Sequence, residues 1–261
     1  MQFNSYVFIG FFLPVTVAGF AVAVRLGRQV AVGWLIAASL LFYAWWNPGS
    51  LPILLGSVLG NYALSRLIRR TGGRRQTVVT AFGVAANLGA LAWCKYLAAV
   101  LDILGLHAAA THAGDPVLPL GLSFFTFTQI GYLLDCRAGL AERSSLPDYV
   151  LFVTFFPSIA AGPILTDREI MPQLADRMTW RPSAMNLCIG GGFFLIGLLK
   201  KTLLADPLSE IVAPGFARPD ALSLLVAWQT ALGYSLQLYF DFSGYSDMAI
   251  GLGRMFGLRL P

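Results

Sequence analysis

The stretch Tyr234–Gly251, YSLQLYFDFSGYSDMAIG, decides how the whole chain is interpreted. It closes a long apolar run that begins near Ala221, yet it places acids, an amide and hydroxyls among aromatic and aliphatic residues. An aspartate near the centre of a bilayer costs roughly 2.5–3.5 kcal/mol on insertion scales, so such residues face a protein interior or a water-filled cavity. We therefore predict a buried polar patch made of Gln237, Asp241, Ser243, Tyr245, Ser246 and Asp247.

A continuous helix would sort these polar residues onto two faces. Asp241 and Tyr245 lie four residues apart on one face, and Ser243 and Asp247 lie four apart on a second. The alternative is that the helix ends at Phe240 and that both aspartates lie at the membrane surface. The two interpretations differ in whether the acids are covered by protein.

The composition indicates a membrane protein rather than a soluble domain. Hydrophobic residues make up 57% of the 261 positions, charged residues only 12%, and the mean hydropathy is +0.69. The formal charge of +5 comes from basic residues in short connections between apolar runs, which determine topology and do not indicate a nucleic-acid partner. The prediction is an all-α polytopic transmembrane bundle, with residues 1–261 in a single membrane-embedded domain.

Apolar runs long enough to cross a bilayer alternate with short polar connections. The connection Arg66–Gln76 carries five arginines and is predicted to be cytoplasmic. The N-terminus is then expected outside. The predicted spans before the central stretch are Tyr6–Val24, Val30–Trp46, Leu51–Ile68, Thr77–Leu106, Leu118–Asp135 and Met185–Ala205.

The topology after Leu146 stays open. Leu146–Leu165 contains Pro157 and the pair Gly162-Pro163, which break helices, so this segment either spans the membrane or is re-entrant. Asp206-Pro207 is expected to stop the helix that precedes it. The charge rule gives no single answer, because arginines at 168, 177 and 181 and the pair Lys200-Lys201 lie at opposite ends of one apolar run.

Small residues suggest where helices approach closely. The run Gly190-Gly191-Gly192 is better explained by tight helix packing than by phosphate binding, since no strand precedes it and no P-loop lysine follows. Gly244 lies between the two aspartates, where it permits a close approach or a break in the helix. Gly56 and Gly60 have GxxxG spacing, which is a weak signal.

A second polar group lies in the run PLGLSFFTFTQIGYLLD from Pro119. Thr128 and Tyr132 share a helical face, and Gln129 lies beside them. These side chains either line a substrate path or make the ordinary hydrogen bonds that hold membrane helices together. His107 and His112 lack a third metal ligand at a suitable spacing, so we predict no metal site.

Five sequence blocks occur in a characteristic order. They are LLFYAWWNP from Leu40, PLGLSFFTFTQIGYLLD from Pro119, FFPSIAAGPI from Phe155, GLLKKTLLADPL from Gly197 and LQLYFDFSGYSDMAIGLGRMFGLRLP from Leu236. With these blocks the chain resembles the membrane-bound O-acyltransferase family nearly end to end, in particular the bacterial branch that includes the alginate O-acetylation membrane subunit. Thr128 and Ser158 depart from the pattern, because glutamine is usual at both positions.

The resemblance implies an acetyl transfer across a bacterial cytoplasmic (inner) membrane. The donor would be cytoplasmic acetyl-CoA or another acyl thioester, with no bound cofactor. The acceptor would be an extracytoplasmic polysaccharide such as alginate, and the partners would be the lipid bilayer and periplasmic acetyl-handling proteins.

The resemblance also implies a catalytic histidine in a W-R-R-W-H-type segment after the motif that ends here in LRLP. Neither His107 nor His112 matches that histidine, so no catalytic residue is carried over to this chain. The bundle is then incomplete at its C-terminus, and the 261-residue chain alone is expected to be inactive. The alternative is a non-enzymatic membrane scaffold or transport subunit that retains the helix bundle.

Overall fold

The computed structural model describes residues 2–103, 119–142, 144–159, 162–163, 165–181, 183–218 and 222–261. Within these ranges every regular element is a helix, which confirms the predicted all-α class. Five described helices are long and apolar enough to cross a membrane, so the chain is a multi-pass membrane protein. They cover Phe8–Leu26, Arg28–Trp46, Pro48–Arg70, Gly73–Tyr96 and Ala184–Ala217.

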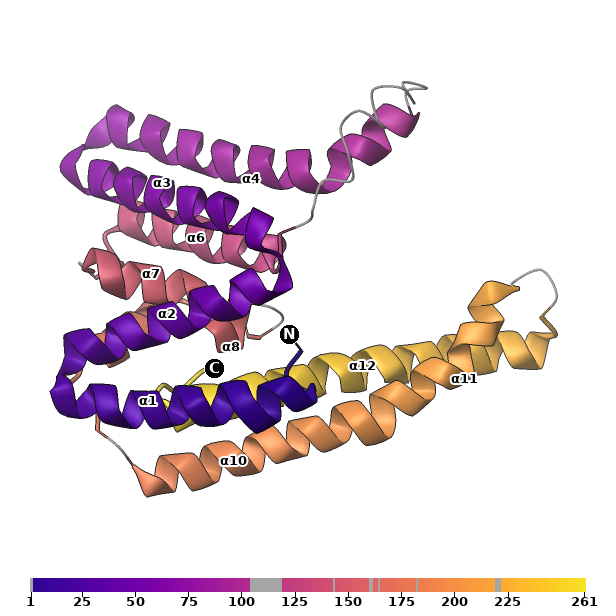
Figure 1. Cartoon of the computed structure of the whole chain (residues 1–261). Helices are drawn as coiled ribbons and strands as arrows, with labels where there is room; N and C mark the ends of the chain where they lie inside the picture. Colours follow the sequence, from indigo (N-terminus) through magenta and orange to yellow (C-terminus); the bar gives the residue numbers. More distant parts are fainter. Residues whose placement is uncertain are drawn as a thin grey trace.

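The first half of the chain forms two adjoining layers (Figure 1). Helices α1 (Leu13–Leu26) and α2 (Arg28–Trp46) form an antiparallel pair joined at Gly27, whose φ of 126° suits glycine. Helices α3 (Leu51–Arg70), α4 (Gly73–Ile103) and α6 (Leu122–Ala138) stack beside that pair.

Three short helices pack against these layers: the first contacts α2, α3 and α6, the second contacts α2 and the last long helix, and the third contacts the first. They are α7 (Leu146–Thr154), α8 (Phe156–Ile159) and α9 (Asp167–Ala175). Each is far shorter than the roughly 20 residues needed to cross a bilayer. The segment that the sequence left open as spanning or re-entrant is therefore a broken, largely buried pair of helices, with the break at Phe155.

The last third of the chain is a long antiparallel arrangement (Figure 1). Helix α10 (Ala184–Leu199) continues through a π-helical turn, Lys200–Ala205, into α11 (Asp206–Ala217). Helix α12 (Leu224–Met255) packs along both.

Two expectations about helix ends are corrected by this arrangement. Asp206-Pro207 does not stop the helix, because Pro207 follows the π turn at the start of α11, where its missing N–H is tolerated. The alternative in which a helix ends at Phe240 is also wrong, since α12 is continuous from Leu224 to Met255.

The arginine-bearing connections gather at one end of the bundle, on the left in Figure 1. Arg28, after α1, pairs with Asp148 of α7 at 2.5 Å and donates to the carbonyl of Leu174 in α9. Arg69, at the end of α3, donates to the carbonyls of Ala141 and Glu142 after α6. The connections after α1, α3 and α6 therefore lie on the same side.

Lys200 and Lys201 do not lie in a connection at all. They lie within the continuous helical run from α10 to α11, where both form ion pairs. This explains why the charge rule gave no single answer for this region.

Candidate functional site

Helices α10 and α12 approach closely because glycines face one another across their contact. A Cβ atom placed on Gly190 would lie 2.5 Å from the carbonyl oxygen of Gly251, and one on Gly244 would lie 2.8 Å from that of Gly197. No real side chain tolerates the first distance without movement of the backbone. The predicted close packing is confirmed for Gly190 and Gly244 but is wrong for Gly191 and Gly192, where no described atom lies within 4 Å of a Cβ atom. We call this contact the glycine seam.

The glycine seam brings Lys200 against the polar residues of α12. The Nζ atom of Lys200 lies 2.5 Å from Oδ2 of Asp247 and donates to Oγ of Ser243 at 2.9 Å. Ser243 and Asp247 thus share one partner, as expected for residues four apart on a continuous helix. The side chain of Asp247 is 21% exposed and that of Lys200 31%, so the pair is half-buried.

Lys201 holds the other face of α12. Its Nζ atom lies 2.8 Å from Oδ1 of Asp241 and 2.9 Å from Oδ1 of Asp206. Asp206 directly follows the π turn that contains Lys201, and this wider turn brings residues five apart closer together than a regular helix does. Two consecutive lysines thereby bind carboxylates on two faces of one neighbouring helix.

The resulting cluster of Lys200, Lys201, Asp206, Asp241 and Asp247, here called the lysine–aspartate network, balances most of its own charge. It contains three carboxylates and two ammonium groups. Charged residues in membrane helices pair in this way because an unpaired charge in hydrocarbon is costly. An ammonium group donates hydrogen bonds and accepts none, so Lys200 does not act as a base on Ser243 in this arrangement.

The other predicted residues of α12 lie beside this network. Tyr245 stacks on Phe3, with ring centroids 4.6 Å apart. Gln237 and Ser246 are half-buried, and no hydrogen bond from either side chain is present among the described residues.

The predicted residues of α6 belong to a separate group. Gln129 is fully buried, and its Oε1 accepts a hydrogen bond from Ser57 of α3 at 3.3 Å. The hydroxyl of Tyr132 contacts Oγ of Ser144 at 2.8 Å. Thr128 borders a hollow of about 10 Å³, which holds about one water molecule at most. Among the described residues, no hydrogen bond or ion pair joins these side chains to the lysine–aspartate network.

One buried acid was not identified from the sequence. Asp167, at the start of α9, is 2% exposed and lies beside Asp135, the carboxylate that pairs with Arg168. Burial, together with the neighbouring Asp135 carboxyl, raises the pKa of Asp167 to about 7. A protonated Asp167 can donate to Asp135, whereas its oxygens otherwise have no partner in the described part of the chain. Residues 32 positions apart give no local signal of this contact. The histidines at 107 and 112 lie outside the described residues.

Comparison with known proteins assigns the family. The sequence model of MBOAT, the membrane-bound O-acyltransferase family, matches residues 112–260. The chain belongs to this family. That range includes α6, the lysine–aspartate network and the glycine seam, so both polar groups predicted from the sequence lie in the MBOAT part of the chain.

Individual MBOAT relatives match nearly the whole chain. Peptidoglycan O-acetyltransferase of Helicobacter pylori is 37% identical over 100% of this chain and 55% of its own length. The probable alginate O-acetylase AlgI of Azotobacter vinelandii is 36% identical over 99% of this chain and 52% of its own length. Teichoic acid D-alanyltransferase of Lacticaseibacillus rhamnosus is 26% identical over 100% of this chain and 64% of its own length. The chain spans about half the length of the O-acetyltransferase relatives.

Proposed function

We propose that this chain is the N-terminal portion of a membrane O-acyltransferase that moves acetyl groups from a cytoplasmic thioester donor, acetyl-CoA, toward an extracytoplasmic polysaccharide. The observation that carries the proposal is the match of nearly the entire chain, at 36–37% identity, to two proteins named as O-acetyltransferase and O-acetylase. The arginine-rich end of the bundle would face the cytoplasm, which puts the N-terminus outside. Periplasmic acetyl-handling proteins would be its partners in the inner membrane.

The acceptor in this proposal is an alginate-like polysaccharide, and a second candidate is peptidoglycan. The peptidoglycan relative is 37% identical and the alginate relatives are 33–36% identical, so overall identity does not separate the two acceptors. The identity of the acyl group, acetyl, is itself a proposal, because a third relative is named for the transfer of D-alanyl groups instead.

The two polar groups have different roles in this proposal. The lysine–aspartate network and the glycine seam form a closely packed wall whose charged groups already have partners. Gln237, Tyr245 and Ser246 on α12, with Thr128 on α6, are the residues proposed to line the substrate path. Gln129 and Tyr132 support α6 through hydrogen bonds to its neighbours.

The catalytic base in this proposal is a histidine in the C-terminal half of the full-length protein. General-base assistance of this kind contributes about 10²- to 10⁴-fold to a rate. The isolated 261-residue chain is therefore expected to transfer no acetyl groups.

The test compares two proteins in proteoliposomes. One is the 261-residue chain, and the other is the chain fused to the C-terminal half of the Azotobacter vinelandii relative. Acetyl-CoA with a labelled acetyl group is supplied on one side, and alginate or peptidoglycan glycan strands on the other. We expect label on one of the two glycans with the fusion and none with the chain alone.

The result that would overturn the proposal is a folded fusion that labels neither glycan from either side of the membrane, while the intact relative labels alginate in parallel. That result would favour the non-enzymatic scaffold or transport subunit. Label transfer by the 261-residue chain alone would instead overturn the assignment of the base to the other half.

A further inference from the structure

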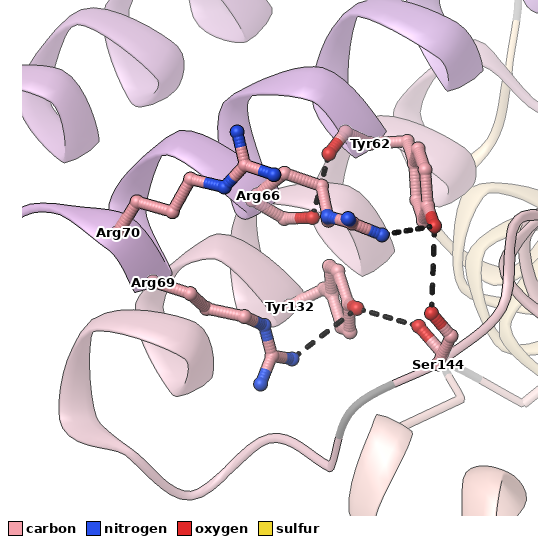
Figure 2. Close-up of a pocket in the computed structure, with 7 residues that line it drawn as sticks. Tyr62, Arg66, Arg69, Arg70, Tyr132 and Ser144 are labelled. Atoms are coloured by element: carbon pink, nitrogen blue, oxygen red, sulfur yellow. Dashed lines mark hydrogen bonds between the residues drawn. The ribbon is translucent and has the colours of Figure 1, made fainter.

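A cavity of about 380 Å³ opens at the arginine-rich end of the bundle, away from the lysine–aspartate network. Figure 2 shows Arg69 of α3 pointing toward Tyr132 of α6 and Arg66 pointing toward the hydroxyl of Tyr62, with Ser144 of the connection to α7 next to both tyrosine hydroxyls. Its volume falls in the range of small-molecule sites, about 300–1,000 Å³. We call it the arginine cavity; it is lined by Tyr62, Ser65, Arg66, Arg69, Arg70, Tyr132 and Ser144.

One wall of the arginine cavity is fixed by hydrogen bonds. Arg69 donates to the carbonyls of Ala141 and Glu142 at 2.8 and 2.7 Å, and to the hydroxyl of Tyr132 at 3.4 Å. Tyr132, which is 2% exposed, shares a hydrogen bond of 2.8 Å with Ser144. The guanidinium of Arg69 also lies over the Tyr132 ring, 5.8 Å from its centroid. These contacts hold one arginine in place before any ligand binds.

The other two arginines keep donors available. Within the described part of the chain Arg66 makes a single side-chain hydrogen bond, to the hydroxyl of Tyr62 at 3.2 Å, although a guanidinium carries five N–H donors. No hydrogen bond from the Arg70 side chain is present in the described part of the chain. The ion pairs found there include none of the three cavity arginines.

The need for positive charge on the cytoplasmic side of the membrane does not by itself account for the positions of the three cavity arginines. A positive connection needs only charge near the membrane surface, and Arg74 and Arg75 supply that at the exposed start of α4. Arg66, Arg69 and Arg70 instead lie at i, i+3 and i+4, on one helical face, where like charges repel. An anion bound between them would remove that repulsion.

We infer that the arginine cavity binds a phosphate group, and this inference rests on the residues of the cavity and not on the proposed acetyl transfer. Guanidinium groups match phosphate oxygens in a two-pronged geometry, and the hydroxyls of Tyr132 and Ser144, which use one proton in their mutual hydrogen bond, keep one O–H donor for a remaining oxygen. A phosphate offers three or more acceptor oxygens to three guanidinium groups, which a carboxylate with two oxygens does not. The phosphate belongs either to a lipid headgroup at the bilayer edge or to a soluble phosphate compound.

The test measures binding to the 261-residue chain in detergent and in nanodiscs. The soluble arm uses pyrophosphate and the rise of the unfolding temperature, with sodium chloride at equal ionic strength. The lipid arm uses native mass spectrometry to count phosphatidic acid retained from nanodiscs that contain phosphatidylcholine and phosphatidic acid. The variant is R66Q/R70Q, which leaves the hydrogen bonds of Arg69 in place. The matched control is R74Q/R75Q, with the same loss of charge outside the cavity.

We expect wild type and R74Q/R75Q to bind one of the two probes, and R66Q/R70Q to bind it about 10- to 100-fold more weakly. Pyrophosphate binding identifies a soluble phosphate compound, and phosphatidic acid binding identifies a lipid headgroup. R70Q alone repeats the measurement in a variant that loses no intramolecular hydrogen bond. Equal binding by R70Q, R66Q/R70Q and wild type overturns the inference, and so does binding of neither probe by wild type. Equal weakening by R74Q/R75Q also overturns it, because the effect is then one of net charge.

Discussion

The lysine–aspartate network and the arginine cavity are two charged regions of this bundle whose charges are paired to very different extents. Around the π turn, two lysines bind three carboxylates, and the atoms are held by a close helix contact. At the arginine-rich end, three guanidinium groups line an open cavity of about 380 Å³ without a carboxylate partner among the described residues. In the first arrangement each charged group has a partner of opposite sign, whereas in the second the arginines have none among the described residues.

The largest effect is expected from removing one lysine of the network. K200M leaves Asp247 without its ammonium partner, and breaking a buried pair from one side costs 3–5 kcal/mol. Because both side chains are still partly exposed, we expect the free energy of unfolding to fall by about 2–3 kcal/mol. Reversible unfolding in mixed micelles measures the change.

The control for this prediction comes from the other charged region. R70Q removes one positive charge from the arginine cavity, and this loss relieves repulsion among the arginines. The free energy of unfolding of R70Q should therefore lie within about 0.5 kcal/mol of the wild-type value. K200M/D247N should recover much of the loss, since no unpaired charge is left. If K200M and R70Q lower the free energy of unfolding equally, the pairing of charges does not distinguish the two regions.

The second prediction concerns the glycine seam that holds the network together. G197A places a methyl group against the backbone of α12 beside Gly244, and overpacking of this kind costs about 1–3 kcal/mol. G191A and G192A are matched controls on the same helix, because nothing lies within 4 Å of a Cβ atom at either position. The controls should be neutral or gain up to about 1 kcal/mol from helix propensity. Unfolding in mixed micelles separates the three variants. Equal losses of unfolding free energy in all of them would show that the close contact at Gly197 does not cause the loss.

The sequence predicted the acids of the network but neither of their partners. Asp241 and Asp247 are conspicuous because acids are rare and costly in an apolar helix. Their pairing with Lys200 and Lys201 depends on the helix contact at Gly190 and Gly197 and on a π turn. The glycines indicated a close contact but not which helices make it, and no local pattern in the sequence encodes the π turn. The lysines were therefore interpreted as topology signals.

The arginine cavity could not be predicted for a related reason. Its charges were visible as a positive connection, but its walls come from α3, α6 and the connection near Ser144, which lie far apart in the chain.

Small-residue spacing was also an unreliable guide to close helix contacts. Gly56 and Gly60 have the GxxxG pattern, yet nothing lies within 4 Å of a Cβ atom at either position, whereas Gly190 and Gly251 make the close contact.

The third prediction tests the acid near the arginine-rich end by its pH dependence. The pKa of Asp167 is raised to about 7, above the value of about 3.9 for an unfolded aspartate. The folded state therefore holds a proton that the unfolded state has lost between pH 4 and pH 7. Stability contributed by this group is greatest at low pH and falls as pH rises through about 7.

We expect the loss from this group between pH 5 and pH 8 to be about 2–3 kcal/mol, measured by unfolding at both pH values. D167N keeps the hydrogen-bonding shape without the charge and should flatten the dependence. A dependence that is unchanged in D167N would assign the titration to another group.

The smallest effect is expected at a neutral polar pair in the α3 layer. Asn61 of α3 and Asn87 of α4 exchange two side-chain hydrogen bonds, at 3.1 and 2.7 Å, and both are buried. Side-chain hydrogen bonds between membrane helices average about 0.6 kcal/mol and reach about 1.7. A double-mutant cycle of N61L, N87L and N61L/N87L should therefore give a coupling energy of about 0.6–1.7 kcal/mol, well below the loss in K200M. A coupling energy as large as that of Lys200 with Asp247 would mean that burial of polar atoms, and not the pairing of charges, determines the stability lost when either pair is broken.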